Sequence, residues 1–320
     1  MKILVTGGAG FVGSVIVRLL QQEGVEVVVL DNLACGHQES VTCPVIIEDL
    51  LNKKQFTLAL KNHEFNAVIH LAAYALPGES MLNPSKYFQN NLQGGLNLLE
   101  YMKEKSIPCI IHSSSCAIYG KSSKLPIEES SPKIPESVYG ETKLMFETIL
   151  SWYSKLYEIK HINLRYFNVA GATIDGLLGE RHETETHIIP NAIKCAIQGT
   201  EFRLFGNKYK THDGTCIRDY IHVEDLASAH LLALNSLTSG DDSNSYNLGS
   251  GFGHSNLEVI NMIEDVSGFK LRLKYEPARA GDPPIVYADT SKVQKLLSFT
   301  PKYSDLRTII ETAYRWHRAF

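Results

Sequence analysis

Short apolar runs alternate with amphipathic segments through the first half of the chain. The runs lack the polar alternation of a half-exposed strand, and they cover Ile3–Val5, Val25–Leu30, Ala67–Leu71, Cys109–His112 and Ile162–Tyr166. Runs of this length are typical of parallel strands that are covered on both faces. Helix-like segments lie between them, at Gly13–Glu23, Lys53–Asn62, Tyr87–Lys105 and Val138–Leu156. Strands that alternate with helices indicate an α/β fold with a Rossmann-type, doubly wound parallel sheet.

The pattern changes after about Val169. Glycine and histidine become frequent, loops lengthen, and Asp241–Ser245 is expected to be a polar surface loop. We therefore expect a second, smaller, mixed α/β domain. The first domain is predicted to cover residues 1–168 and a returning segment at about 215–238. The second domain is predicted to cover residues 169–214 and 239–320.

Composition narrows the class of protein. The chain has 320 residues, of which 44% are hydrophobic and 21% charged, and its net charge of −4 favours neither a nucleic acid nor a membrane as partner. Its six cysteines form no C-x-x-C pair, and no Cys/His cluster has zinc spacing. We expect reduced thiols, no metal, no signal peptide or membrane span, and a cytoplasmic location.

A glycine-rich segment follows the first predicted strand and opens the first predicted helix. Thr6-Gly7-Gly8-Ala9-Gly10-Phe11-Val12-Gly13 has the spacing G-x-x-G-x-x-G. Glycine lets the backbone turn sharply and approach a pyrophosphate, and a helix N-terminus offers free N–H groups to phosphate. Asp31 directly follows the second run, where a carboxylate binds an adenosine ribose and repels a 2′-phosphate. The pattern predicts a dinucleotide site that favours NAD over NADP.

Tyr139 and Lys143 lie four residues apart at the start of a predicted helix, so their side chains share a face. A tyrosine with its ordinary pKa near ~10 is a poor base at neutral pH, and a nearby ammonium group lowers that pKa. Ser115 follows a predicted parallel strand, at the edge where open α/β sheets bind ligands. A serine hydroxyl there can bridge the tyrosine and a reacting hydroxyl. The three residues predict proton transfer at a substrate hydroxyl.

Taken together, these features resemble the extended short-chain dehydrogenase/reductase family. Further motifs resemble the UDP-glucose 4-epimerases of that family, nearly end to end and in order, and they are Pro77–Ser80, Leu164–Gly171, Asp213–Val223, Tyr246–Gly249 and Arg279–Asp282. The resemblance implies interconversion of UDP-glucose and UDP-galactose with enzyme-held NAD. Hydride leaves C4 of the sugar, the 4-keto sugar turns in the site, and hydride returns to its other face. This chemistry serves galactose metabolism or polysaccharide synthesis.

The resemblance also implies roles for individual residues. Tyr139 is the base, Lys143 tunes it and holds the nicotinamide ribose, and Ser115 steers the proton. The implied cofactor-binding residues are Gly7, Gly10, Phe11, Val12, Gly13, Asp31, Asn32, Asp49, Leu50, Leu71, Ala72, Ala73, Asn91, Ser113, Tyr139, Lys143 and Tyr166. The implied substrate-binding residues are Ser115, Tyr139, Asn168, His187, Ile188, Leu204, Phe205, Arg218, Arg279, Asp282 and Val286. The two arginines suit the diphosphate, because guanidinium matches phosphate in bidentate geometry.

Three positions depart from the family pattern. Ala117 stands where the family often has Thr, Ala75 where some members have Lys, and Val286 where some glucose-restricted members have Tyr. The small residue at position 286 leaves more room at the sugar, which leads to the hypothesis that N-acetylated sugars are accepted. The resemblance further implies a homodimer, whose contact we expect at the predicted helices Tyr87–Lys105 and Val138–Leu156.

Several alternatives remain open. A 4-epimerase for UDP-GlcNAc and UDP-GalNAc, or for UDP-xylose and UDP-arabinose, shares every motif. An inactive protein that only binds NAD or a sugar nucleotide is disfavoured by the intact set of Ser115, Tyr139 and Lys143. A 4,6-dehydratase needs acidic residues after the catalytic serine, where this chain has Cys116-Ala117. A simple NADP reductase is disfavoured by Asp31.

Overall fold

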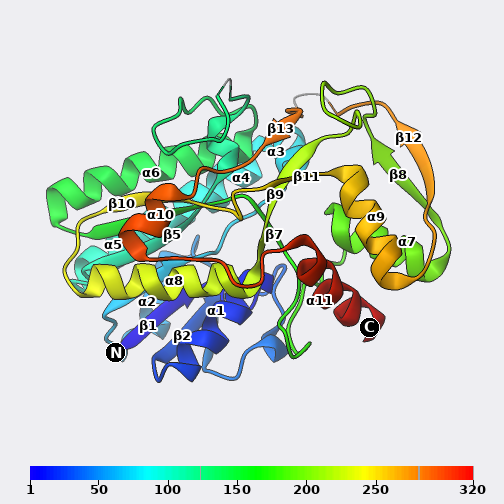
Figure 1. Ribbon diagram of the computed structural model, residues 1–320. Coiled ribbons are helices and arrows are strands. Elements are labelled where there is room, and N and C mark those ends of the chain that lie inside the picture. Colours follow the sequence, from blue (N-terminus) through cyan, green and yellow to red (C-terminus); the bar gives the residue numbers. More distant parts are fainter. Residues whose placement is uncertain (123, 280–281, 320) are drawn as a thin grey trace. The chain divides into compact units, whose positions relative to one another are not determined.

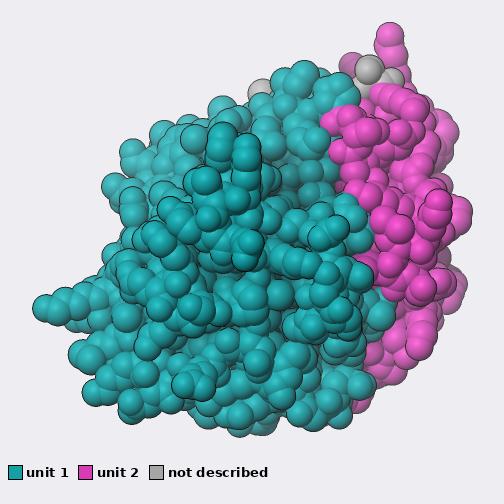
Figure 2. Space-filling view, turned by 90° about the vertical axis from the view of Figure 1, so that its left-hand side faces the viewer, with its two compact units in different colours: residues 1–121, 132–166, 227–246 teal, residues 122–131, 167–226, 247–320 magenta. Residues whose placement is uncertain are grey.

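The structure is a computed structural model that describes residues 1–122, 124–279 and 282–319, in two compact units. Figure 2 colours unit 1 teal and unit 2 magenta. Unit 1 comprises Met1–Lys121, Pro132–Tyr166 and Ala227–Tyr246. Unit 2 comprises Ser122–Ser131, Phe167–Leu226 and Asn247–Phe320. The predicted assignment of cofactor and substrate to separate domains stays a prediction.

Unit 1 is built on a seven-stranded sheet in the described part of the chain. Its order is β3-β2-β1-β4-β5-β6-β10, and the strands from β3 to β6 pair in parallel. This is the doubly wound, Rossmann-type order that the apolar runs predicted. The strands are β1 (Lys2–Thr6), β2 (Glu26–Asp31), β3 (Val45–Ile47), β4 (Ala67–His70), β5 (Cys109–Ser115), β6 (Lys160–Tyr166) and β10 (Asn244–Leu248).

Helices connect and cover these strands, and Figure 1 shows α5 and α6 side by side. One face of the sheet packs against α2, α5 and α6 through a continuous apolar cluster. The helices are α1 (Phe11–Gln22), α2 (Lys53–Ala59), α3 (Pro77–Leu82), α4 (Pro84–Tyr87), α5 (Gly94–Glu104), α6 (Val138–Tyr157) and α8 (Val223–Thr238), most of which belongs to unit 1. Short helical turns are η1 (Gln38–Ser40), η2 (Phe88–Gln93) and η3 (Cys116–Tyr119).

Two predicted elements differ from the structure. The segment Asp241–Ser245 was expected to be a loop throughout, but β10 begins at Asn244 and pairs with β6. Ser245 faces a polar partner in the sheet, because its hydroxyl accepts a hydrogen bond from Asn163 Nδ2 at 3.1 Å. The single helix predicted over Tyr87–Lys105 is interrupted by the π-helical turn η2 before α5 begins. Polar residues and a short length hid the strand, and a π-helical turn has no signature in apolar spacing.

Unit 2 is a mixed α/β body with two small sheets. In one, β9 pairs in parallel with β7 and β13 and antiparallel with β11, and in the other β8 pairs in parallel with β12. Helices α7, α9 and α11 pack around a second apolar cluster. The elements are β7 (Asn168–Ala170), α7 (Ile188–Gln198), β8 (Glu201–Phe205), β9 (Ile217–His222), β11 (Gly253–Ser255), α9 (Asn256–Ser267), β12 (Arg272–Glu276), β13 (Ile285–Val286), α10 (Ser291–Leu297) and α11 (Leu306–Ala319).

Two general expectations can be compared with the structure. All six cysteines are free, as predicted. None of the helices in the described residues combines the length and the apolar character that a membrane crossing requires.

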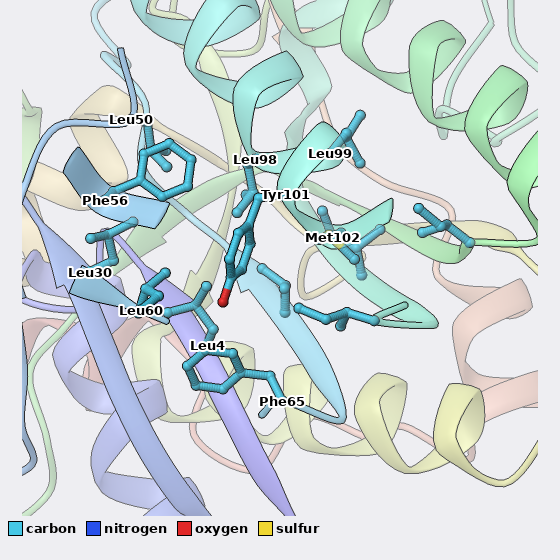
Figure 3. Packing of buried hydrophobic residues seen from close by; sticks show 14 of the residues in the cluster. Leu4, Leu30, Leu50, Phe56, Leu60, Phe65, Leu98, Leu99, Tyr101 and Met102 are labelled. Atoms are coloured by element: carbon cyan, nitrogen blue, oxygen red, sulfur yellow. The ribbon is translucent and has the colours of Figure 1, made fainter. Parts of the chain in front are cut away.

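Tyr101 carries its hydroxyl group into the core of unit 1. Figure 3 shows Tyr101 of α5 among Leu4, Leu60 and Phe65, with its hydroxyl directed into the apolar cluster. The Tyr101 ring packs edge-on against Phe56, with ring centroids 5.8 Å apart. Its hydroxyl has no hydrogen-bond partner among the described residues, and burial raises its pKa to about 12. The sequence alone does not distinguish Tyr101 from an ordinary aromatic residue of the core.

We predict that Tyr101→Phe increases the free energy of unfolding by about 1–2 kcal/mol, because it removes a buried polar group that makes no hydrogen bond. Tyr101→Ala is the contrasting variant and should lower stability by about 3–5 kcal/mol through the cavity it leaves. Urea unfolding of the three proteins measures both effects. A loss of stability in Tyr101→Phe would show that the hydroxyl is hydrogen bonded in solution.

Candidate functional site

The carboxyl ends of the parallel strands place the predicted cofactor residues along one edge of the unit 1 sheet. The glycine loop follows β1, Asp31 ends β2, Leu71 follows β4, Ser115 ends β5 and Tyr166 ends β6. Strands β1 and β4 are neighbours although β2 and β3 separate them in sequence, so the strand order reverses there. Open α/β sheets bind ligands at this kind of reversal, outside the carboxyl ends of the strands.

Close packing excludes a side chain at two glycines of the loop, whereas a third glycine has space beside it. Gly7 has a positive φ of 73°, and a Cβ there would lie 2.6 Å from the backbone nitrogen of Ala72. A Cβ on Gly13 would lie 2.3 Å from the carbonyl oxygen of Gly7. A Cβ on Gly10 would meet only an ordinary contact at 3.5 Å. The need to avoid these clashes therefore explains why Gly7 and Gly13 are glycines. Gly10 has no such clash, and its lack of a side chain leaves the backbone accessible beside the start of α1.

Helix α1 begins without any group that would compete with an anion. Gly10 is its N-cap, so no side chain caps the helix, and no acidic residue lies in its first turn. The N–H groups of Phe11, Val12 and Gly13 are the first of the helix, and groups in these positions lack intrahelical partners. Together with the positive end of the helix dipole, they suit a phosphate group.

Carboxylate and amide groups line the next part of the edge. One oxygen of Asp31 accepts the Ala9 N–H at 3.0 Å and the other accepts the Leu33 N–H at 2.9 Å, so the carboxylate also holds the glycine loop. Asn32 donates to Asp49 at 2.9 Å. Leu50 extends its side chain into the apolar cluster, which leaves its backbone as the part nearest the edge.

The loop after β4 is held in place by Asn91. This buried amide accepts the Tyr74 N–H and donates to the Tyr74 carbonyl, both at 3.0 Å, and it also donates to Thr142 of α6 at 3.2 Å. Leu71 donates its N–H to Thr6 at 2.9 Å, and Ala72 and Ala73 follow it. Asn91 is thus engaged in fixing the loop that carries three of the predicted cofactor residues.

The first turn of α6 brings Tyr139 to Ser115. Ser80 of α3 accepts the Tyr139 N–H at 3.0 Å, and Ser137 caps the helix by accepting the Gly140 N–H at 3.1 Å. A Cβ on Gly140 would lie 2.6 Å from the Ala117 carbonyl oxygen, so only glycine lets the helix approach the turn after β5. The Tyr139 and Ser115 side chains form a hydrogen bond. The structure therefore brings these two predicted catalytic residues together.

Burial sets the acid–base properties of the predicted catalytic pair. It raises the pKa of Tyr139 to about 12, against the opposing effect of the hydrogen bond with Ser115. It lowers the pKa of Lys143 to about 7, against the opposing charge of Glu147. Lys143 Nζ lies 5.9 Å from the Tyr139 ring centre and donates to the Ser113 carbonyl at 2.5 Å. Lys143 is thus beside Tyr139 and close to its protonation midpoint at neutral pH.

Sequence reasoning missed a buried ionic network behind this pair. Glu147 lies one turn after Lys143, and its carboxylate accepts two hydrogen bonds from Arg165 of β6 at 2.9 and 2.7 Å. It also accepts the Ser114 hydroxyl at 2.6 Å, while Arg165 donates to the Tyr119 hydroxyl at 2.8 Å. Both charged side chains are less than a tenth exposed. The i, i+4 spacing from Lys143 was the one signal in the sequence.

Tyr166, the last predicted cofactor residue, has its hydroxyl 2.5 Å from Nε2 of His230 in α8. Burial raises the pKa of Tyr166 well above its usual range. All the predicted cofactor residues lie in unit 1. Apart from Ser115 and Tyr139, all the predicted substrate residues lie in unit 2.

Unit 2 joins two of its predicted substrate residues directly. Arg218 of β9 forms an ion pair and hydrogen bond with Asp282, and it also donates to the Ile217 carbonyl at 2.8 Å. Asn168 of β7 donates to the Asp219 carbonyl at 2.9 Å. Val286 is the register partner of Arg218 in the adjoining strand β13. These residues therefore gather around β9, although Ala280 and Gly281 of the motif before Asp282 lie outside the described residues.

The other predicted substrate residues lie around β8 and α7. The Arg279 guanidinium lies 4.3 Å from the ring centre of Phe205, a cation–π contact at the end of β8. Leu204 is buried in the unit 2 cluster. His187 is the N-cap residue of α7, and Ile188 is its first residue.

Asp219 is a second residue that sequence reasoning missed. It is fully buried, and its carboxylate accepts hydrogen bonds from the Ser250 N–H and hydroxyl, both at 2.7 Å, and from the Gly251 and Ala288 N–H groups at 3.1 and 3.0 Å. Its position next to Arg218 inside a quoted motif was the available signal. Asp219 connects three segments of unit 2 and so fixes the strand that carries Arg218.

The fold and the placement of these side chains define a nucleotide-binding α/β enzyme of the hydride-transfer class. The profile of the NAD dependent epimerase/dehydratase family matches residues 3–249. The chain belongs to this family.

Individual relatives match along the whole chain. A UDP-glucose 4-epimerase of Streptococcus mutans is 44% identical, over 100% of this chain and 98% of that protein. The crystal structure of UDP-glucose 4-epimerase from Brucella ovis in complex with NAD is 43% identical, with a TM-score of 0.95, over 99% of this chain and 98% of that one. The UDP-Glc/GlcNAc 4-epimerase of Campylobacter jejuni is 40% identical, with a TM-score of 0.86, over 100% and 99% of the two chains.

We predict that Glu147→Gln lowers the free energy of unfolding by about 3 kcal/mol, because it leaves the buried Arg165 guanidinium without its counter-charge. Glu104→Gln is the matched control, since Glu104 pairs with Lys53 at the surface and such pairs contribute about 0–1 kcal/mol. Chemical denaturation of both variants measures the difference. Equal losses of stability in the two variants would show that the buried pair stabilises the fold no more than the surface pair does.

Proposed function

We propose that this chain is a UDP-glucose 4-epimerase that interconverts UDP-glucose and UDP-galactose with enzyme-held NAD. One observation carries the proposal. The side chains of Tyr139 and Ser115 interact at the carboxyl edge of the sheet, and Lys143 lies one turn further along α6. Full-length similarity to UDP-glucose 4-epimerases supports it. The free cysteines support a cytoplasmic location, where thiols stay reduced.

The residues of unit 1 fit NAD. The uncapped start of α1 and the open face of Gly10 suit the pyrophosphate, and Asp31 at the end of β2 suits an unphosphorylated ribose. We propose that Lys143 holds the nicotinamide ribose. When bound, NAD supplies the acceptor and donor of hydride. NAD is present in the crystal structure of the Brucella ovis relative, which supports the same cofactor here.

Tyr139, Ser115 and Lys143 handle the proton of the sugar 4-hydroxyl. Oxidation at C4 requires that proton to leave, and reduction from the other face requires it to return. The Tyr139 pKa of about 12 makes the phenolate costly by roughly 7 kcal/mol relative to a pKa near 7. The ammonium form of Lys143 offsets part of this cost, because a positive charge nearby favours the phenolate. Ser115 is hydrogen bonded to Tyr139 and so can relay the proton.

Unit 2 offers groups for the uridine diphosphate. We propose that Arg218, Arg279 and Asn168 bind the diphosphate, that Asp282 meets the nucleotide ribose, and that Leu204, Phe205, His187 and Ile188 frame the uracil. Arg218 and Asp282 already form an ion pair, which holds each in a defined orientation. A preformed arrangement of this kind lowers the entropy cost of binding.

Val286 favours a second candidate activity, epimerisation of UDP-GlcNAc and UDP-GalNAc. Its side chain is small and nearly buried beside Arg218 in the β13–β9 pair. A short aliphatic residue leaves volume that a tyrosine would fill. The similarity to the UDP-Glc/GlcNAc 4-epimerase of Campylobacter jejuni supports the same possibility.

Incubation with UDP-galactose, UDP-GalNAc and UDP-arabinose, without added NAD, tests these activities together. We expect conversion of UDP-galactose to UDP-glucose, and conversion of UDP-GalNAc at a comparable rate if Val286 opens the sugar pocket. Product separation by liquid chromatography measures the rates. Conversion of UDP-arabinose alone would replace the proposed substrate, and no conversion of any sugar would favour the inactive binding protein.

The variant Tyr139→Phe tests the catalytic assignment in the same assay. Loss of the phenolic hydroxyl should reduce kcat by about 10²–10⁴-fold, the range for removal of a general acid–base group. NAD should still be bound, as measured by absorbance after its release by denaturation, because the other cofactor-binding residues of unit 1 remain in place. Tyr153→Phe on the same helix is the control and should retain full activity, since the Tyr153 hydroxyl donates its hydrogen bond to Glu100 of α5 and to none of the predicted site residues that the structure describes. Unchanged activity in Tyr139→Phe would refute the assignment.

We also propose that the protein is a homodimer in which α6 packs against its counterpart. Met145, Trp152 and Leu156 are exposed and lie 7 and 4 residues apart, so they form one apolar stripe on this helix. Apolar spacing of this kind is typical of helices that pair in bundles and dimers. The stripe lies on one of the two helices for which the dimer contact was predicted.

We predict that the native protein has a mass of twice 35.7 kDa by light scattering, and that Trp152→Glu shifts it towards the monomer. A charge in a dimer contact must be desolvated without a partner, which weakens association. Phe269→Glu is the control, because Phe269 is similarly exposed but lies in unit 2. A dimer that survives Trp152→Glu would show that another surface forms the contact.

A further inference from the structure

Four potential metal ligands meet at the start of α7 in unit 2. They are Glu180, His182, Glu185 and His187, and their ligating atoms all lie within 4.8 Å of one another. Within residues 1–122, 124–279 and 282–319, no other group of three or more His, Cys, Asp or Glu side chains meets this condition. Sequence reasoning looked for Cys/His spacing and so passed over this E-x-H-x-x-E-x-H segment.

The separations between these atoms match the coordination shell of a small divalent cation. His182 Nδ1 lies 3.3 Å from an oxygen of Glu180 and 3.3 Å from an oxygen of Glu185. His187 Nδ1 lies 3.5 Å from Glu185 and is hydrogen bonded to Glu180. Ligands about 2.0–2.2 Å from a tetrahedral zinc ion are separated from each other by about 3.3–3.6 Å. We propose that these four side chains form a binding site for Zn²⁺ or a similar divalent transition-metal ion.

The backbone on both sides of the cluster is fixed by neighbouring structure. Trp316 of α11 donates its indole N–H to the Glu180 carbonyl at 3.0 Å. Gly179 packs so closely on the same indole that a Cβ would lie 2.5 Å from it. Glu185 accepts the Thr186 and His187 N–H groups at 2.8 and 2.9 Å and so fixes the backbone just before α7. Ligands held by rigid elements lose little entropy when a metal binds.

Charge also favours a cation here. The carboxylates of Glu180 and Glu185 are only 6% and 4% exposed, so their negative charges need a positive partner. Hydrogen bonds with the two imidazoles supply part of this compensation. A divalent cation bound by all four groups would supply it more completely.

The positive end of the α7 dipole acts against a cation at this position. Glu185 reduces that effect, because its carboxylate already accepts two N–H groups at the helix start. His317 interacts electrostatically with Glu180 and Glu185, and Lys194 acts on His317. Four protein ligands leave no coordination position for substrate, which is typical of a structural zinc site. The ion would therefore fix the segment that leads into α7.

The experiment is isothermal titration of the full-length, untagged and chelator-treated protein with Zn²⁺. We expect one high-affinity ion per chain and weaker binding at lower pH, because imidazole binds a metal ion only in its neutral form. Repeating the titration at a lower pH measures this dependence. Binding of Co²⁺ should give the visible absorption of a tetrahedral complex.

His182→Ala should weaken Zn²⁺ binding by more than about tenfold, since it removes a ligand. Glu185→Gln is a second variant, which keeps an oxygen for the helix N–H groups but removes the charge. His212→Ala is the control, because His212 lies near Asp213 and Glu258 outside the cluster. Zinc affinity that is the same in wild type, His182→Ala and Glu185→Gln, or an absence of binding, would overturn the proposal. The titration contains no substrate or NAD, and the ion would bind His187 through Nδ1, so its outcome does not decide whether His187 also meets the uracil.

Discussion

The buried carboxylate of Glu147 is the constraint on which the candidate site depends. It binds Arg165 of β6 and Ser114 of β5 from the middle of α6. One turn earlier on the same helix lies Lys143, and two turns earlier lies Tyr139. Ser115 and Tyr166 are the next residues of the two strands that Glu147 holds. The pair therefore fixes the distance between a helix and two strands whose ends carry the proton-transfer groups.

The same carboxylate balances the charge of Lys143. Burial alone lowers the pKa of this lysine, and the charge of Glu147 opposes the effect, so the pKa lies at about 7. Arg165 also donates a hydrogen bond to the Tyr119 hydroxyl, which fixes the orientation of the guanidinium. A lysine near its midpoint can change charge at little cost as the charge around it changes. Tyr139 has the opposite property, since burial makes its phenolate expensive until a positive charge is beside it.

The sequence was most informative where the conformation of a short segment determines which residue type it needs. The glycine loop is an example, because the backbone contacts that exclude a Cβ from Gly7 and Gly13 come from the turn itself and from the neighbouring strand. The five strands β1, β2, β4, β5 and β6 also followed from the alternation of apolar runs with helices, whereas β3 did not. Glu147 and Asp219 were not found, because their partners lie in other segments and a single acidic residue has no periodic signature. The strand β10 was missed for a similar reason, since its polar residues are satisfied only by β6.

A comparison of Glu147 with the pair Glu180 and Glu185 shows that the type of partner decides what a buried carboxylate can do. Glu147 is paired with arginine, which stays charged at any pH the protein meets, so that pair is permanent and serves structure. Glu180 and Glu185 are paired with histidines, whose protons are exchangeable. Imidazole without its proton is a metal ligand, whereas guanidinium has no lone pair to offer. A buried carboxylate pair that faces histidine can therefore be balanced either by protons on the imidazoles or by a metal ion. The carboxylate that faces Arg165 can be balanced only by the guanidinium.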